Sequence, residues 1–144
     1  MKLKKLETLE PIHSDGRGYG FTCSVGEEIL PEDLGKLLKD IFGCTVVRYT
    51  NSGKKISKLA FCSGGAGGNL PLAIAQGADA YITGDVKHDQ WITARNNGIA
   101  LYDCGHFHTE DIAIPYLISR FKAAYAGLEL VQAKADTDPV DYIL

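Results

Sequence analysis

The sequence has no strong excess of charge of either sign, and this excludes one class of partner. Its 144 residues include 15 Lys and Arg against 18 Asp and Glu, a formal net charge of −3. Proteins that bind nucleic acid through bulk charge are normally basic, because they must neutralise phosphates. The short basic cluster at residues 2–5 is predicted to be a solvated terminal segment. Nucleic acid is therefore not expected as a partner.

Long apolar runs and closely spaced cysteines are also missing. No apolar stretch approaches the roughly 20 residues that a membrane span needs. The first residues have no apolar signal core, so we expect a cytoplasmic protein that does not enter a membrane. No Cys-x-x-Cys pair occurs, and three of the four cysteines fall in or beside apolar runs: Cys44, Cys62 and Cys104, with Cys23 elsewhere. This pattern predicts buried free thiols in a reducing compartment.

The features that are present indicate a single α/β domain over residues 1–144. A hydrophobic content of 45% is ordinary for a globular core of this size. From residue 56 onward, apolar runs alternate with helical patterns in the order β-α-β-α-β-α-β, with strands expected at 56–62, 78–82, 99–103 and 128–133. This order predicts a three-layer α/β/α fold with a mainly parallel mixed sheet. Further strands are expected at 1–10, 21–25 and 44–50, the last as the hairpin partner of 56–62.

Helix signals separate these strands. Pro31 suits a first helical position, an apolar stripe follows at i, i+3, i+4 and i+7 spacing, and Gly43 ends the pattern. Shorter helices are expected at 69–76 and 86–97. A final helix is expected from Thr109 to Tyr125, irregular around Pro115.

A glycine-rich loop, residues 63–68, follows the strand at 56–62 and precedes a helix. Gly64, Gly65 and Gly67 are candidate cofactor-binding residues, because their backbone amides can approach a phosphate at a helix N-terminus. The fit to a dinucleotide fingerprint is loose, and no Lys-Ser/Thr pair makes it a P-loop. The alternative is a tight strand-to-helix turn where side chains do not fit.

The next strand ends in the loop Thr83-Gly84-Asp85-Val86-Lys87-His88. Asp85 can cap the following helix. Lys87 and His88 are candidate catalytic residues that could hold an anionic or polarised group at the sheet edge. The alternative is an ordinary helix start.

The third loop, residues 103–110, carries the densest group of side chains that can bind a metal. His106 and Glu110 stand four residues apart, which on a helical turn places both on one face. There they could give one divalent metal a nitrogen and an oxygen ligand. Asp103 and His108 are supporting candidates. The alternative is a helix N-terminus at which Thr109 and Glu110 act as capping groups.

In order and spacing, these three loops resemble the C-terminal half of Nif3-like proteins, a family also called DUF34 or GTP cyclohydrolase 1 type 2 homologues. The Thr-Gly-Asp motif at residues 83–85 followed by Gly-His-x-x-Thr-Glu at 105–110 is the specific part. The glycine-rich stretch 16–20 resembles the start of that half. The resemblance covers roughly residues 10–140.

The resemblance implies a three-layer α/β fold, a dinuclear metal site and often a toroidal hexamer, so a homo-oligomer is expected. His106 and Glu110 match the two metal ligands that the C-terminal half contributes. The family's other ligands come from a His-His-Pro segment and an aspartate in an N-terminal half, and this sequence has no His-His-Pro. We therefore expect weak binding of a divalent metal (zinc, iron, manganese or magnesium) unless other groups complete the site.

Two functions remain open. The first is a metal-dependent hydrolase of the GTP cyclohydrolase type, acting on a small molecule such as a nucleotide through a metal-activated water. The second is a non-catalytic domain that binds a metal or ligand in regulation or interaction. No residue in the sequence selects guanine.

Overall fold

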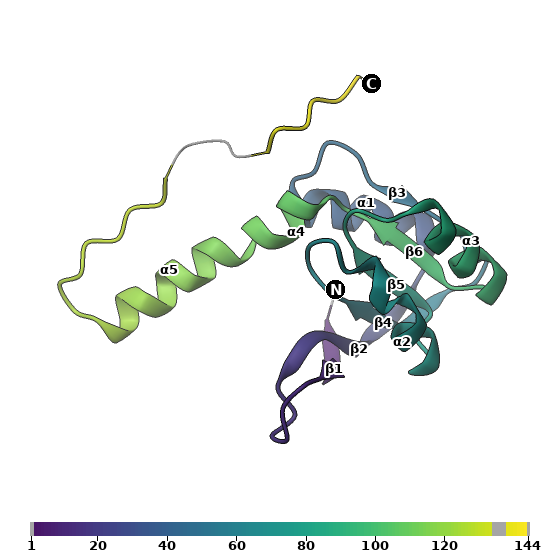
Figure 1. Cartoon of the computed structure of the whole chain (residues 1–144), viewed down its shortest axis with the longest axis horizontal. Coiled ribbons are helices and arrows are strands. Elements are labelled where there is room, and N and C mark those ends of the chain that lie inside the picture. The colour runs from purple at the N-terminus through teal and green to yellow at the C-terminus, as the bar shows by residue number, and fades with distance from the viewer. Residues whose placement is uncertain (1, 134–137, 144) are drawn as a thin grey trace.

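The computed structural model describes residues 2–133 and 138–143, and a six-stranded sheet lies at its centre (Figure 1). The strand order is β1-β2-β4-β5-β6-β3. The strands are β1 (Leu3–Pro11), β2 (Gly18–Ile29), β3 (Arg48–Tyr49), β4 (Ile56–Phe61), β5 (Ala80–Thr83) and β6 (Ala100–Asp103). The helices are α1 (Pro31–Phe42), the 3-10 turn η1 (Ala66–Asn69), α2 (Leu70–Ala75), α3 (His88–Asn97), α4 (His106–Asp111) and α5 (Ala113–Ala124).

The sheet is mixed, as predicted, with its parallel part in the centre, but it is not mainly parallel: among the described strands two pairings are parallel and three are antiparallel. β4, β5 and β6 pair in parallel, whereas β1–β2, β2–β4 and β3–β6 pair antiparallel. The parallel strands β5 and β6 are buried along their whole length, as strands covered on both faces must be. The carboxyl ends of β4, β5 and β6 all reach the same edge of the sheet.

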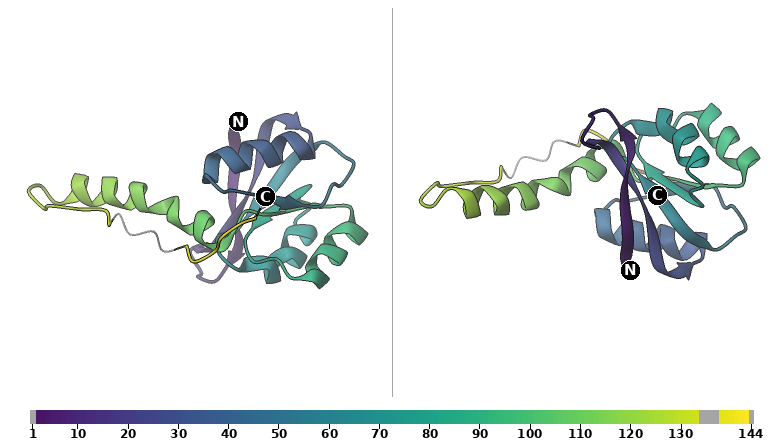
Figure 2. Two further views of the ribbon diagram at one scale, coloured as in Figure 1. Left: turned by 90° about the horizontal axis from the view of Figure 1, so that it is seen from above. Right: turned by 90° about the horizontal axis from the view of Figure 1, so that it is seen from below.

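Helices cover both faces of the sheet, which confirms the three-layer architecture (Figure 2). On one face, Leu34 and Leu38 of α1 pack in a core cluster with Ile82 and Tyr102. On the other face, Leu70 of α2 and residues of α3 enclose a second cluster. All four cysteines are buried free thiols in these clusters. The sequence predicted this for Cys44, Cys62 and Cys104.

Two strand predictions were wrong. Residues 44–50 do not form a hairpin with 56–62: Arg48 pairs with Asp103 and Tyr49 with Tyr102, while β4 lies between β2 and β5. β4 carries buried side chains on both faces and takes a central position, whereas the two exposed residues of β3 suit an edge. Residues 128–133 contain no strand: they follow α5, which extends away from the sheet, and β3 is the strand beside β6.

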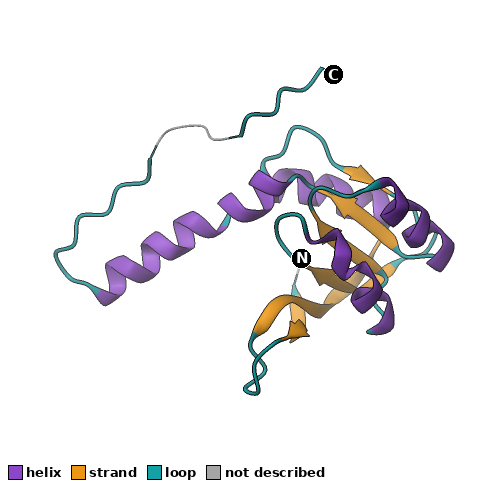
Figure 3. Ribbon diagram, viewed as in Figure 1, coloured by secondary structure: helices purple, strands orange, loops and turns teal. Residues whose placement is uncertain are grey.

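The predicted helix from Thr109 to Tyr125 is two helices, α4 and α5, which meet at Ile112 (Figure 3). Pro115 is the third residue of α5, where its missing N–H costs nothing, and its ring disfavours continuation of the preceding turn. α5 extends away from the sheet and buries none of its residues. No helix in the described part of the chain has the length and apolarity to cross a membrane.

Candidate functional site

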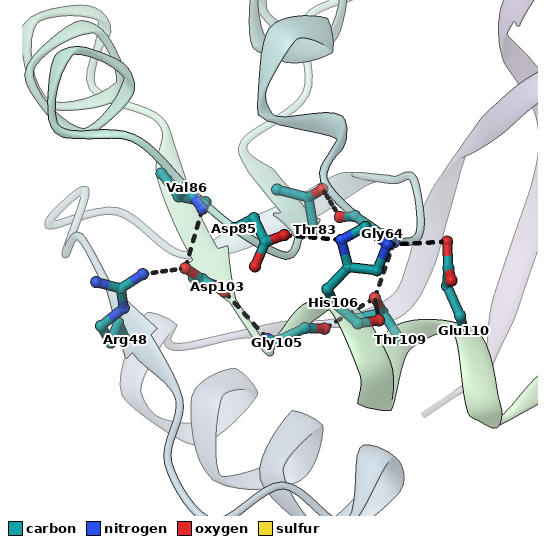
Figure 4. A network of polar contacts seen from close by, with 10 residues as sticks. All are labelled: Arg48, Gly64, Thr83, Asp85, Val86, Asp103, Gly105, His106, Thr109 and Glu110. Carbon is teal, nitrogen blue, oxygen red and sulfur yellow. Dashed lines mark hydrogen bonds and ion pairs between the residues drawn. The ribbon is translucent and has the colours of Figure 1, made fainter. Parts of the chain in front are cut away.

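The loops after β4, β5 and β6 meet at the carboxyl edge of the sheet and are joined through Gly64 (Figure 4). The Gly64 amide donates to Thr109 Oγ1 at 2.9 Å. The Gly64 carbonyl accepts from Thr83 Oγ1 at 3.1 Å and from the Gly84 amide at 2.9 Å. Thr83 and Thr109 are buried, so these bonds are shielded from water. The three motifs singled out in the sequence therefore form one structural unit.

Glycine is required where these loops touch. A Cβ on Gly64, which has φ +65°, would lie 2.5 Å from Glu110 Oε1. A Cβ on Gly84 would lie 2.7 Å from the Gly105 carbonyl carbon and from the His106 amide nitrogen. At Gly84 the clash is with backbone, which cannot move aside, so that position requires glycine. At Gly64 the Glu110 side chain could move away, and it is the left-handed φ that favours glycine there.

This packing limits the use of the glycine loop as a phosphate cradle. The Gly64 amide is already bonded to Thr109 within the fold. A Cβ on Gly67 would lie 2.1 Å from Gln90 Oε1, so this glycine leaves room for the side-chain amide of Gln90. A phosphate-binding role for Gly65 and Gly67 stays a prediction.

The imidazole of His106 lies between two carboxylates. Its Nδ1 is 2.7 Å from Asp85 Oδ2, and its Nε2 is 3.5 Å from Glu110 Oε1. All three side chains are about half exposed. The structure thus brings together the predicted pair, His106 and Glu110, and adds Asp85 on the opposite side of the ring.

Asp85 was predicted to cap the following helix, and that was wrong. The N-cap of α3 is Lys87, and Asp85 faces His106 instead. Its φ of +51° is uncommon for a residue other than glycine, and Asp is among the side chains that tolerate it best. The position of Asp within the Thr-Gly-Asp motif was the sequence signal for this role.

The two carboxylates govern the charge of the ring. The hydrogen bond to Asp85 raises the pKa of His106 above its ordinary value; partial burial works against this, and the Glu110 carboxylate adds to the rise. The site therefore favours positive charge between its carboxylates, supplied either by a proton or by a cation.

Asp103, one of the two supporting ligand candidates, holds the surrounding backbone. Its buried carboxylate accepts from the Arg48 guanidinium, from the Val86 amide at 3.0 Å and from the Gly105 amide at 3.0 Å. It therefore ties β3 to the loops that carry Asp85 and His106. The other candidate, His108, is mostly buried and lies 3.5 Å from Asp138 Oδ2.

A cavity of about 680 Å³ opens beside His106. Its lining includes Arg48, Asp85, His106, Phe107, Glu110 and Tyr142. Lys87 and His88 are exposed at the start of α3 and are not among the described residues that line this cavity. Their catalytic role stays a prediction.

Comparison with known proteins gives a family match over residues 1–139, to the model described as Duf34/NIF3 (NGG1p interacting factor 3). The chain belongs to the Duf34/NIF3 family. A relative from Pseudomonas aeruginosa, named GTP cyclohydrolase 1 type 2 homolog, is 36% identical over 117 residues, which cover 78% of this chain and 45% of the relative. A relative of the same name from Staphylococcus aureus is 28% identical over 130 residues, covering 88% of this chain and 36% of the relative.

Solved structures agree with the Duf34/NIF3 assignment. The crystal structure of Staphylococcus aureus protein SA1388 superposes with a TM-score of 0.76 at 28% identity, covering 88% of this chain and 42% of that one. A Bacillus cereus protein related to NIF3 superposes with a TM-score of 0.74 at 22% identity, covering 88% and 36%, and this likeness concerns the fold alone. The chain spans about half the length of the Duf34/NIF3 relatives it matches, or somewhat less.

Proposed function

We propose that this chain is a divalent-metal-binding domain in which His106 Nε2 and Glu110 Oε1 are ligands. The observation that supports this most directly is the 3.5 Å separation of these two atoms at the carboxyl edge of the sheet. Two ligands that each lie about 2.1 Å from one ion, at a tetrahedral angle, are about 3.4 Å apart. An imidazole and a carboxylate are also the ligand types that zinc, iron and manganese share.

Two ligands make a weak site. The described part of the chain contains no group of three or more His, Cys, Asp or Glu side chains placed to hold an ion. A structural or catalytic zinc normally has at least three protein ligands. We propose that the remaining ligands come from outside this segment, from a second copy in a homo-oligomer or from sequence such as the other half of the longer relatives.

The second part of the proposal concerns chemistry. The relatives' name, GTP cyclohydrolase 1 type 2 homolog, suggests hydrolysis of a nucleotide or a similar small molecule. A divalent ion at this position would supply Lewis acidity and a water of lowered pKa. The 680 Å³ cavity beside His106 is within the size range of small-molecule sites, and Arg48 is the arginine in its lining.

Metal titration followed by calorimetry tests the binding proposal. We expect zinc or manganese to bind wild-type protein and expect binding to fall at least tenfold in His106→Ala and in Glu110→Gln, because each removes one ligand. His13→Ala is the matched control, since His13 lies in the exposed turn between β1 and β2. Equal affinity in wild type and His106→Ala contradicts the assignment.

A non-catalytic binding domain is the second candidate, and the incomplete ligand set in a half-length segment favours it. A nucleotide turnover assay with added metal separates the two. Turnover of GTP that is lost in Glu110→Gln supports the hydrolase. Metal binding without turnover supports the binding domain.

A further inference from the structure

We propose that Asp85 is a positioning residue that fixes the tautomer and orientation of the His106 ring. The purpose of such positioning rests on the proposed metal-binding function. The contact between Asp85 and His106 does not, because it forms within the protein without a metal. Asp85 Oδ2 lies 2.7 Å from His106 Nδ1, and the two residues belong to loops that follow different strands, β5 and β6. Figure 4 shows the carboxylates of Asp85 and Glu110 on opposite sides of the His106 ring.

The chemistry of the contact determines where the ring proton sits. An ionised carboxylate can only accept, so a neutral imidazole bonded to it carries its proton on Nδ1. Nε2 then keeps its lone pair, and Nε2 is the atom that faces Glu110 at 3.5 Å. A histidine that ligates a metal commonly donates its other N–H to a carboxylate in this way, which fixes the ring and increases its basicity as a ligand.

The backbone holds Asp85 in place for this contact. Gly84 packs so closely on Gly105 and the His106 amide that a Cβ would lie 2.7 Å away. On its other side, the Val86 amide is bonded to buried Asp103, which also accepts from the Gly105 amide. The loop that carries Asp85 is thus tied directly to the loop that carries His106.

Neither helix capping nor an ordinary turn accounts for Asp85. The backbone amides that precede α3 pair elsewhere: Val86 with Asp103 and Lys87 with Gln90 Oε1. Glycine would adopt a φ of +51° at lower cost than Asp. The carboxylate therefore has a use at this position that outweighs the conformational cost, and His106 is the side chain it contacts.

Two variants test the proposal: Asp85→Asn, which keeps the shape, and Asp85→Gly, which keeps the backbone conformation. The first measurement is 15N NMR of the His106 ring nitrogens in metal-free protein at alkaline pH. We expect protonated Nδ1 and unprotonated Nε2 in wild type, and a shift toward protonated Nε2 in Asp85→Gly, which removes the acceptor. The shift should be smaller in Asp85→Asn, because its amide oxygen can still accept from Nδ1. The second measurement is zinc affinity by calorimetry, which we expect to fall 10- to 100-fold in both variants.

Asp89→Asn is the matched control, because Asp89 is an exposed carboxylate in the first turn of α3 and its replacement changes the charge equally. Circular dichroism and thermal melting establish that each variant is folded. A wild-type tautomer in folded Asp85→Gly, or an unprotonated Nδ1 in wild-type protein, overturns the role of Asp85. Absence of zinc binding to wild type overturns the proposed function instead, while the NMR result still decides the role of Asp85.

Discussion

Asp79 shows how a single carboxylate can join two strands away from the site. Its Oδ2 accepts hydrogen bonds from the Ser57 amide at 2.9 Å, the Ser57 hydroxyl at 2.8 Å and the Lys58 amide at 2.9 Å. Burial acts to raise the pKa of Asp79, but these three bonds outweigh it and hold the pKa below its ordinary value. The charged form therefore connects the start of β4 to the turn before β5.

Asp79→Asn should lower the free energy of unfolding at neutral pH by on the order of 1 kcal/mol, because charge-assisted hydrogen bonds are lost. A depressed folded-state pKa stabilises the fold above the unfolded pKa of about 3.9, and this stabilisation is lost as pH falls through the folded pKa. The difference between wild type and variant should therefore be constant near neutrality and shrink below about pH 4. Urea unfolding across this pH range measures it.

The control for this experiment is Asp15→Asn, whose carboxylate pairs with Arg17 in an exposed turn. Exposed pairs contribute little, so its effect should be near zero at every pH. If the loss of unfolding free energy in Asp79→Asn does not change with pH, the charge of the carboxylate is not the stabilising feature.

Among single residues, local spacing predicts some neighbours and misses others. His106 and Glu110 lie within one turn of α4, so their four-residue spacing was enough to place them together. The contact between Asp85 and His106 joins residues 21 apart and depends on a positive φ at Asp85. A contact of this kind requires the sheet to bring two loops together, and neither periodicity nor composition contains that information.

Among elements, the patterns that come from burial were the reliable ones. The apolar stripe of α1 and the short buried strands β4, β5 and β6 appear close to where the sequence placed them. Strand partners were harder to predict. The hairpin proposed for 44–50 and 56–62 assumed that strands adjacent in the sequence pair with each other, whereas the order of strands in the sheet follows how buried each strand is. Residues 128–133 are apolar enough for a strand, but no strand edge is free for them beside β6.

α5 and α1 provide a matched comparison, because each has 12 residues but only α1 packs in the core. A helix of this length is marginal without tertiary contacts. We therefore expect backbone amides of α5 to exchange with deuterium at least tenfold faster than those of α1, as seen by hydrogen–deuterium exchange mass spectrometry of the isolated chain. Equal protection of the two helices would contradict this and would mean that α5 is covered in solution.

The exposed apolar side chains of α5 fit the same expectation. Ile114, Tyr116, Leu117 and Phe121 are between 37% and 63% exposed. Such residues add little stability to a helix that has no surface to pack against, since the stabilisation comes from apolar area removed from water.

For the molecule as a whole, the four buried thiols are distributed over both core clusters, one on each face of the sheet. Cys23, Cys44 and Cys104 lie in the cluster under α1, and Cys62 lies in the cluster under α2 and α3. Burial raises the pKa of each thiol, which removes the reactive thiolate.

We expect native protein to react with an aromatic disulfide reagent at least a hundredfold more slowly than unfolded protein, in which four thiols per chain should react. Both the raised pKa values and the lack of access slow the native reaction. Absorbance of the released product, with and without denaturant, measures the two rates. Rapid reaction of one thiol under native conditions would show that one of the two clusters opens independently of the other.

For protein engineering, the packing of Gly84 on Gly105 divides the surroundings of His106 into a fixed side and an adjustable side. On the backbone side there is no space for even a methyl group. On the cavity side, Val46 and Phe107 line open space next to the imidazole. Substitutions intended to change which molecules fit beside His106 therefore belong at those two positions, where shape can be altered while the loops that hold the ring keep their conformation.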